Sequence, residues 1–309
     1  MVRHLPGGCI AELQRHAPAR SHRRARQHQR LIIGPWSHSN FTGSFPEREF
    51  GPAAGSAALD LTGILLRWFD RWLKDEDNNA EAEPPVLVFV MGIDRWRTES
   101  DWPIPDTQHR SYFLHGDGAL SLQAPGEEPP DIFVYNPFQP VPTLGGQVIL
   151  PGANADGPRD QRLVEERDDV LVYSTPVLDN PVEVVGPIEL RLFVASSARD
   201  TDFTGKLVDV YPDGRAMILT EGILRARYRN SLTQPELLEP DAVYELRLDL
   251  WATANVFLPG HRIRLEVRAA TSHGLAATAI RVARSPLNPR MRTDRPSIVS
   301  CTMRRTRRV

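Results

Sequence analysis

Lys206–Val210, KLVDV, followed by Tyr211–Arg215, YPDGR, decides the fold of most of this chain. Polar and apolar residues alternate along KLVDV, as they do in a strand with one face on a core and the other in water. The Asp213-Gly214 pair predicts a hairpin turn, because these residue types readily supply positive φ angles. Since the alternation returns in Arg262–Val267, RIRLEV, we predict antiparallel β structure throughout this region.

Short strand-like runs separated by turn residues fill the chain from about residue 108 onward, and no helix of convincing length interrupts them before about residue 268. The 27 prolines and 21 glycines, many at the borders of these runs, suit such a turn-rich structure. We therefore predict that residues 108–309 form a β-sandwich or a jelly roll. The expected strands are Ser111–Leu114, Asp131–Tyr135, Val170–Ser174, Val182–Ser196, Phe203–Tyr211, Arg215–Tyr228, Tyr244–Trp251 and His261–Val267.

Residues 1–107 follow a different pattern, in which a helix lies between two apolar runs. Leu31–Ile33 is typical of a buried strand, and Val86–Met91, VLVFVM, predicts a strand buried on both faces. Strand, loop, helix and strand in this order are typical of an α/β sheet, so the predicted fold class is mainly β with an α/β part. The helix is expected at Asp60–Lys74, with a core-facing apolar stripe made of Leu61, Ile64, Leu65, Trp68, Phe69, Trp72 and Leu73.

The loop after Leu31–Ile33 carries Trp36, Ser37 and His38 directly behind a Gly-Pro break. A histidine on a short polar loop at the end of a buried strand is how an α/β enzyme can present a general base. A histidine that only caps its loop is the more common explanation of such a pattern. From the spacing alone, His38 is therefore a candidate catalytic residue with an inert alternative.

The composition of the chain narrows the classes of function that it can have. The 309 residues are 41% hydrophobic and 25% charged with a net charge of −2, so the whole molecule is not built to bind polyanions.

Cys9 and Cys301 are the only cysteines, so we expect no metal site, no disulfide and a reducing, cytoplasmic location. No secretory leader and no membrane span are expected, because no apolar run of about 18 residues occurs. The arginine-rich segments 12–30 and 303–308 leave nucleic-acid binding as a disfavoured alternative, testable by its salt dependence.

A series of motifs in a fixed order gives the chain a more specific likeness. They are LIIGPWSHSNFTG at Leu31–Gly43, LRWFDRWLK at Leu66–Lys74, VFVMGIDRWRTESDWPIP at Val88–Pro105, LGG at Leu144–Gly146, DGPRDQR at Asp156–Arg162, DDVLVYST at Asp168–Thr175, DTDFTGKLVDVYPDGRA at Asp200–Ala216 and ANVFLPGHRIRLEV at Ala254–Val267. Through them the chain resembles the C-terminal half of the cocaine esterase / X-Pro dipeptidyl-peptidase family of serine hydrolases. The resemblance implies the end of an α/β-hydrolase domain in residues 1–107, followed by a jelly roll of the galactose-binding-like type in residues 108–309, with no cofactor.

For the site, the resemblance implies that His38, in the WSH motif, is the histidine of a Ser-Asp-His triad. It would take the serine proton during acylation and activate water for deacylation. The implied substrates are small-molecule esters or X-Pro peptides. Ile149 and Leu150, in the apolar run after Gly145-Gly146, are candidates for the wall of the acyl site, and an ordinary strand is the alternative.

The chain departs from the family at both ends. The family's G-x-S-x-x-G nucleophile elbow has no counterpart, and Ala270–Gly274, ATSHG, resembles one only superficially. Where the family carries its aspartate stands Met1–Gly8, whose codons can read Trp-Tyr-Asp-Ile-Phe-Leu-Gly one base later. A two-base shift in Cys301–Arg308 likewise yields a His-Pro-Ser segment similar to the family's last strand. We hypothesise that residues 1–11 and 268–309 are frame-shifted, which the flanking DNA would test.

Two functions follow. The chain is either a fragment of a serine hydrolase that contributes His38 and the jelly roll and is inactive alone, or a catalytically inactive jelly-roll binding module. A homo-oligomer is left open. A partial sheet would also leave strand edges unpaired around Leu31–Gly34 and Val86–Met91, and would leave the apolar stripe of the helix Asp60–Lys74 incompletely covered.

Overall fold

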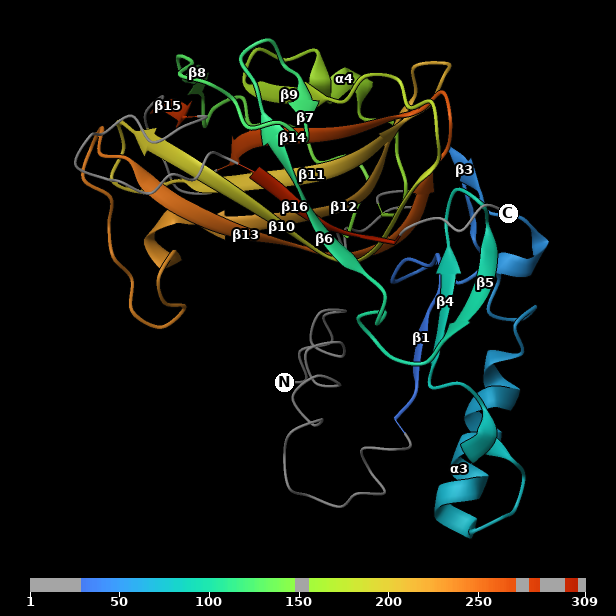
Figure 1. The fold of residues 1–309 in the computed structure, drawn as a ribbon. Helices are drawn as coiled ribbons and strands as arrows, with labels where there is room; N and C mark the ends of the chain where they lie inside the picture. Colours follow the sequence, from blue (N-terminus) through green and yellow to red (C-terminus); the bar gives the residue numbers. More distant parts are fainter. Residues whose placement is uncertain (1–28, 148–155, 271–277, 284–297, 305–309) are drawn as a thin grey trace. The chain divides into compact units, whose positions relative to one another are not determined.

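β-Strands dominate the computed structural model, which describes residues 29–147, 156–270, 278–283 and 298–304 (Figure 1). The chain divides into two units. The first consists of residues 1–106 and Ala254–Val256, and the second of residues 107–253 and 257–309. The expectation of a mainly β chain is confirmed.

The first unit is built on a three-stranded sheet in the order β1 (Leu31–Ile33), β4 (Val86–Val90) and β5 (Arg95–Glu99). β1 and β4 are parallel neighbours joined through the helix α3 (Leu61–Lys74), which confirms the predicted strand, helix and strand. β5 pairs antiparallel with β4 and was not predicted, because RWRTE has neither an apolar run nor clean alternation. The remaining elements are β2 (Ser44–Phe45), β3 (Arg48–Glu49) and the short helices η1 (Pro52–Ala54) and η2 (Ala80–Ala82).

Two expectations about this sheet need correction. Leu31–Ile33 is only half-buried, because β1 is the outer strand of the three in the described part of the sheet. Among the described residues no strand pairs with its outer edge, in agreement with the prediction for Leu31–Gly34. The same prediction is wrong for Val86–Met91, because β4 lies in the centre and is paired by β1 on one side and β5 on the other.

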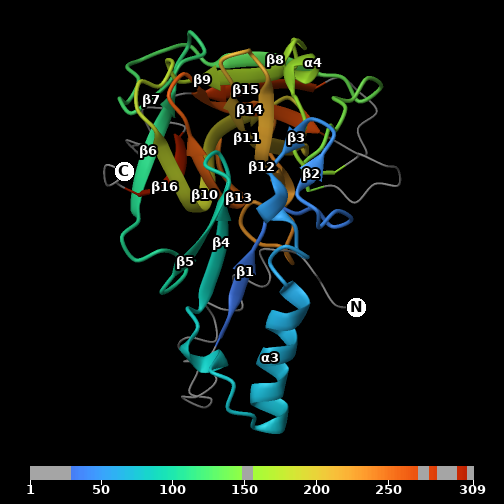
Figure 2. The same cartoon turned by 90° about the vertical axis from the view of Figure 1, so that its right-hand side faces the viewer.

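Most of the apolar stripe of the helix α3, which was expected to face a core, is not buried. Asp60 caps its first turn by accepting a hydrogen bond from the Gly63 amide, and ion pairs such as Lys74–Asp70 and Arg71–Asp75 occupy its polar side. Of the stripe only Ile64 is buried, whereas Phe69 is 52% and Leu73 is 78% exposed. Within the unit, α3 extends past the end of the sheet at which β1 and β4 begin, as both views show (Figure 2). The incomplete cover expected for this stripe is therefore present.

Three residues from late in the chain complete the first unit. Met91, just beyond β4, donates its amide to the Ala254 carbonyl at 2.9 Å and accepts from the Val256 amide at 2.8 Å. Gly92 follows with φ +84°, and a Cβ atom there would lie 2.0 Å from the Val256 carbonyl oxygen. This close backbone approach is one that only glycine permits.

Replacing Gly92 by alanine is expected to lower the free energy of unfolding by about 2–4 kcal/mol, because the clash with Val256 adds overpacking to a strained φ. Gly214→Ala is a matched control, since Gly214 has φ +87° but a Cβ atom added there would have nothing within 4 Å. It should lose only about 1 kcal/mol. Urea unfolding of both variants measures the difference, and equal losses would contradict the role given to the Val256 contact.

The second unit contains two antiparallel sheets. The larger has the order β7 (Leu120–Ser121), β6 (Gln108–Leu114), β16 (Ile298–Arg304), β10 (Val182–Ser196), β15 (Thr278–Ala283) and β8 (Asp131–Tyr135), with β13 (Tyr244–Phe257) also paired to β10. The smaller has the order β12 (Ala216–Arg225), β11 (Asp202–Val210), β14 (Arg262–Ala270) and β9 (Val170–Ser174). The short helices are α4 (Arg162–Glu165) and η3 (Ala226–Tyr228). All eight predicted strands are present, and β15 and β16 add two beyond residue 268.

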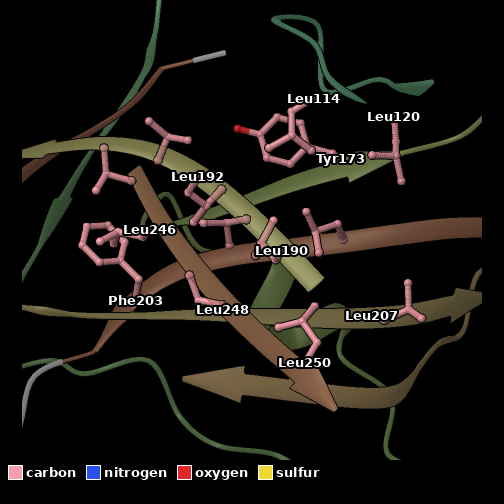
Figure 3. Close-up of a cluster of buried hydrophobic side chains, with 14 of the residues drawn as sticks. Leu114, Leu120, Tyr173, Leu190, Leu192, Phe203, Leu207, Leu246, Leu248 and Leu250 are labelled. Atoms are coloured by element: carbon pink, nitrogen blue, oxygen red, sulfur yellow. The ribbon is translucent and has the colours of Figure 1, made fainter. Parts of the chain in front are cut away.

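One hydrophobic core joins the two sheets of this unit (Figure 3). Leu190 and Leu192 reach it from β10, Phe203 and Leu207 from β11, and Leu248 from β13. All five are buried, and they alternate with residues of the opposite face along their strands, as the sequence pattern predicts.

The hairpin between β11 and β12 forms where it was predicted, with one difference. Gly214 has φ +87°, but Asp213 does not have a positive φ. The Gly214 amide bonds the Tyr211 carbonyl and the Tyr211 amide bonds the Arg215 carbonyl, so Pro212 and Asp213 form an ordinary turn and glycine alone takes the left-handed position.

The polar face of β11 and β14 does not face water, contrary to expectation. Lys206 and Glu266 are each 1% exposed. The segment before α4 covers them, since the Arg268 guanidinium donates to the carbonyls of Val141 and Pro142. Alternation therefore identified the apolar face correctly, but it could not show that another part of the chain lies over the polar one.

Candidate functional site

The loop that carries His38 is anchored at its start by Trp36. Gly34 directly follows the strand β1. It has no side chain, and a Cβ atom at this position would lie 2.5 Å from the Trp36 ring. The space left by the missing side chain accommodates the Trp36 indole, whose Nε1 donates a hydrogen bond to the Ala54 carbonyl at 2.8 Å. The Trp36 ring also lies 5.7 Å from the ring of Trp96, whose own Nε1 donates to the Ala53 carbonyl. The two indoles therefore fasten both the loop and β5 to the helix η1.

Ser37 and Asn40 close the loop. The Ser37 amide donates to the Asn40 carbonyl at 3.0 Å, and the Asn40 amide donates to the Ser37 hydroxyl at 3.1 Å. The Asn40 side chain donates to the Ser44 carbonyl and accepts from the amide and the hydroxyl of Thr42. These local bonds leave only His38 and Ser39 at the tip, and both are exposed.

The imidazole of His38 is thus presented to solvent on a tightly bonded loop. Within the described residues no hydrogen bond or ion pair joins it to another side chain. The other predicted site residues, Ile149 and Leu150, and the elbow-like stretch at 271–274 lie outside the described residues, as do residues 1–28. The structure therefore brings no second predicted site residue to His38. In the same described ranges, no three His, Cys, Asp or Glu side chains gather as metal ligands would.

Sequence analysis missed a Ser-His-Glu arrangement in the second unit. The Ser121 hydroxyl lies 2.9 Å from Nε2 of His115, and Oε1 of Glu128 lies 3.5 Å from its Nδ1. Nε2 also lies 3.1 Å from the Gln123 carbonyl, to which the Ser121 hydroxyl donates as well. Ser121 has a single hydroxyl proton and donates it to the Gln123 carbonyl, so in this arrangement it donates none to His115. The trio is therefore a turn-stabilising network and not a nucleophile with its base.

A His-Asp pair in the LPGHRI motif also has a structural character. Nδ1 of His261 lies 2.8 Å from Oδ1 of Asp209, and both residues are buried. The imidazole packs against Tyr211 with 4.6 Å between ring centroids. The pair therefore joins the start of β14 to the end of β11.

Comparison with known proteins identifies the class. Residues 78–278 match the family described as the X-Pro dipeptidyl-peptidase C-terminal non-catalytic domain. The mainly β second unit and the loop at the end of a parallel strand are therefore parts of a protein related to serine hydrolases. His38 lies before the matched residues.

Individual relatives agree with this class. The chain is 50% identical over 247 residues to the cocaine esterase of a Rhodococcus species, a match that covers 77% of this chain and 43% of that protein. An α-amino acid ester hydrolase structure aligns with TM-score 0.78 and 26% identity over 96% of this chain and 53% of that one. An aminopeptidase structure from a marine sediment Thaumarchaeota archaeon aligns with TM-score 0.76 and 25% identity over 89% of this chain and 49% of that one.

The chain belongs to the cocaine esterase / X-Pro dipeptidyl-peptidase family of hydrolases, which confirms the resemblance drawn from its motifs. It spans about half the length of these relatives. None of the helices in the described residues has the length and apolar character needed to cross a membrane.

Proposed function

We propose that this chain is the C-terminal half of a serine hydrolase and supplies its triad histidine, His38. In the intact enzyme His38 would take the proton of the nucleophilic serine as that serine attacks an ester or X-Pro peptide, and would then activate water to release the acyl group. The observation that carries the proposal is the 50% identity to a cocaine esterase, together with the bonded loop that presents His38.

The form of the second unit is part of the same proposal. Its two sheets share one core, which supports a jelly roll of the galactose-binding-like type. The exposed stripe of α3 supports a neighbouring domain in the intact enzyme, since Phe69 and Leu73 are each more than half exposed. An apolar surface of this kind on an otherwise charged helix commonly marks a protein contact.

The alternative is a binding module without catalytic activity. The description of the matched family as non-catalytic favours it, and so does the lack of a bonded partner for His38 among the described residues. It differs from the first proposal in giving His38 no chemical role.

The purified chain alone is expected to show no hydrolysis of p-nitrophenyl acetate above the background of a His38→Ala variant. A base without its nucleophile and oxyanion donors has nothing to activate, and loss of one triad member typically costs about 10⁴-fold or more in rate. Release of p-nitrophenolate at equal protein concentration measures both proteins. Turnover that disappears with His38→Ala would contradict the view that the chain is inactive alone.

A further inference from the structure

A cluster of buried charges lies on the face of the four-stranded sheet that α4 covers. Lys206 of β11 and Glu266 of β14 are direct cross-strand partners, and Nζ of Lys206 lies 3.5 Å from Oε2 of Glu266. Both side chains are 1% exposed. Neither is used by the proposed catalytic role of His38.

Two residues of the α4 region complete the cluster. Gln161, which precedes α4, accepts a hydrogen bond from Nζ of Lys206 at 2.5 Å, and its amide group donates to the carbonyls of Leu144 and Arg159. Glu165, the last residue of α4, accepts from Nη1 of Arg264 at 2.6 Å. Side chains from β11 and β14 therefore hold both ends of this short helix to the sheet.

Three of the four oxygens of the two carboxyl groups have no hydrogen-bond donor among the described residues. Among the described residues, no partner bonds either oxygen of Glu266 or Oε1 of Glu165. Buried carboxylate oxygens without donors are costly, and a proton on one acid supplies the missing donor. Burial, together with the charge of Glu165, raises the pKa of Glu266 to about 7, against the opposing charge of Lys206. Burial also raises the pKa of Glu165, although Arg264 opposes the increase.

The elements packed around Glu266 present charges of both signs. On β9 its cross-strand partner is the uncharged Val172. The charged groups that face the cluster are Lys206 of β11, Glu221 of β12, Arg264 and Arg268 of β14, Asp160 before α4 and Glu165 within it. The two arginines already have other partners, because Arg264 bonds Ser174 and Glu165 while Arg268 bonds Thr204 and the Val141 carbonyl.

We propose that Glu165 and Glu266 share one proton and act as a pH-sensitive latch that holds α4 and the segment before it on the four-stranded sheet. With the proton in place, one acid donates to the other and the latch is closed. When the proton leaves, two buried carboxylates face each other and α4 loosens from the sheet.

The direction of the pH effect follows from the raised pKa of Glu266. The folded protein holds this proton more firmly than the unfolded chain, so the stabilisation is complete at low pH and is lost as the pH rises through about 7. The first backbone contacts to respond should be the amides of Val164 and Glu165, which bond the Gln161 carbonyl at 2.8 and 3.0 Å.

Hydrogen exchange of these two amides in the full chain tests the latch. Their protection, corrected at each pH for the rate of an unstructured peptide, should fall about tenfold or more between about pH 5.5 and about pH 8.5. The amide of Val194, deep in β10, serves as an internal reference and should keep its protection, which separates local opening from global unfolding.

The variants Glu266→Gln and Glu165→Gln remove one of the two acids and should make the protection of α4 independent of pH. Glu236→Gln removes an exposed, ion-paired carboxyl and should leave the wild-type fall unchanged. Either a constant protection in the wild type or a fall that persists in both cluster variants would overturn the proposal. Neither result depends on ester hydrolysis, so failure of the latch proposal can be distinguished from failure of the proposed enzymatic role.

Discussion

Replacing Lys206 by methionine is expected to lower the free energy of unfolding by about 3–5 kcal/mol at a pH above 7. Methionine fills a similar volume but has no donor. The side-chain oxygen Oε1 of Gln161 then loses its 2.5 Å hydrogen bond, and Glu266 loses the one cation that lies within 4 Å of its carboxylate among the described residues. Below pH 7 the loss should be smaller, because Glu266 takes up a proton and no longer needs a counter-ion.

Urea unfolding followed by tryptophan fluorescence measures this loss. The double variant Lys206→Met with Glu266→Leu should recover a large part of it, since an apolar pair of similar volume often replaces a buried ion pair without penalty. Lys74→Met is the matched control, because Lys74 is paired with Asp70 on the exposed side of α3. A Lys206→Met protein as stable as the Lys74→Met protein would contradict the role given to the buried pair.

A chimera that restores the unmatched half should hydrolyse esters, and this activity should depend on His38. The chimera would carry the N-terminal part of the Rhodococcus cocaine esterase, which this chain does not cover, fused in front of Gln29. That part would bring the nucleophile and the aspartate which the proposed function requires. His38→Ala should then lower kcat/KM for p-nitrophenyl acetate by about 10³-fold or more.

His109→Ala in the same chimera provides the control, since His109 is an exposed histidine on β6. It should leave kcat/KM unchanged. A folded, active chimera that tolerates His38→Ala would remove His38 from the mechanism, whereas the family membership of the chain would be unaffected.

The sequence was most informative where apolar residues alternate or run without interruption. The bounds of β8, β9 and β10 agree with the predicted strands to the residue, because each run ends at a proline, a glycine or a polar turn. β13 extends beyond the predicted Trp251 to Phe257, because Trp251 takes φ +67° within the strand and an apolar pattern carries no sign of such a kink.

Sequence patterns were least informative about which surfaces are covered. Leu65, Phe69 and Leu73 look like core residues but are exposed on α3, whereas Lys206 and Glu266 look like surface residues but are buried. For Lys206 and Glu266 the neighbours that cover them are distant in the chain. Periodicity reports the two faces of an element and says nothing about what packs on them.

The candidate site also combines features that the sequence predicts with features that it does not. The motif WSH placed His38 at the end of β1, and the loop around it is local enough to be anticipated from Gly34 and Asn40. Its role requires a serine and an acid, and no local pattern supplies these. The Ser121, His115 and Glu128 contacts escaped prediction for the opposite reason, since their spacing resembles no catalytic motif and only the hydrogen-bond directions reveal their structural nature.

The contribution of Ala254–Val256 to the first unit sets a constraint on biosynthesis. Met91 and Gly92 leave the ribosome well before the backbone that completes their hydrogen bonds, because residues 107–253 must be made in between. At about 5–20 residues per second, this wait is on the order of ten seconds. During this wait, the nascent chain carries an unfinished sheet that a chaperone could shield. A stop codon placed after residue 106 should therefore yield a product that is degraded and never reaches the native state.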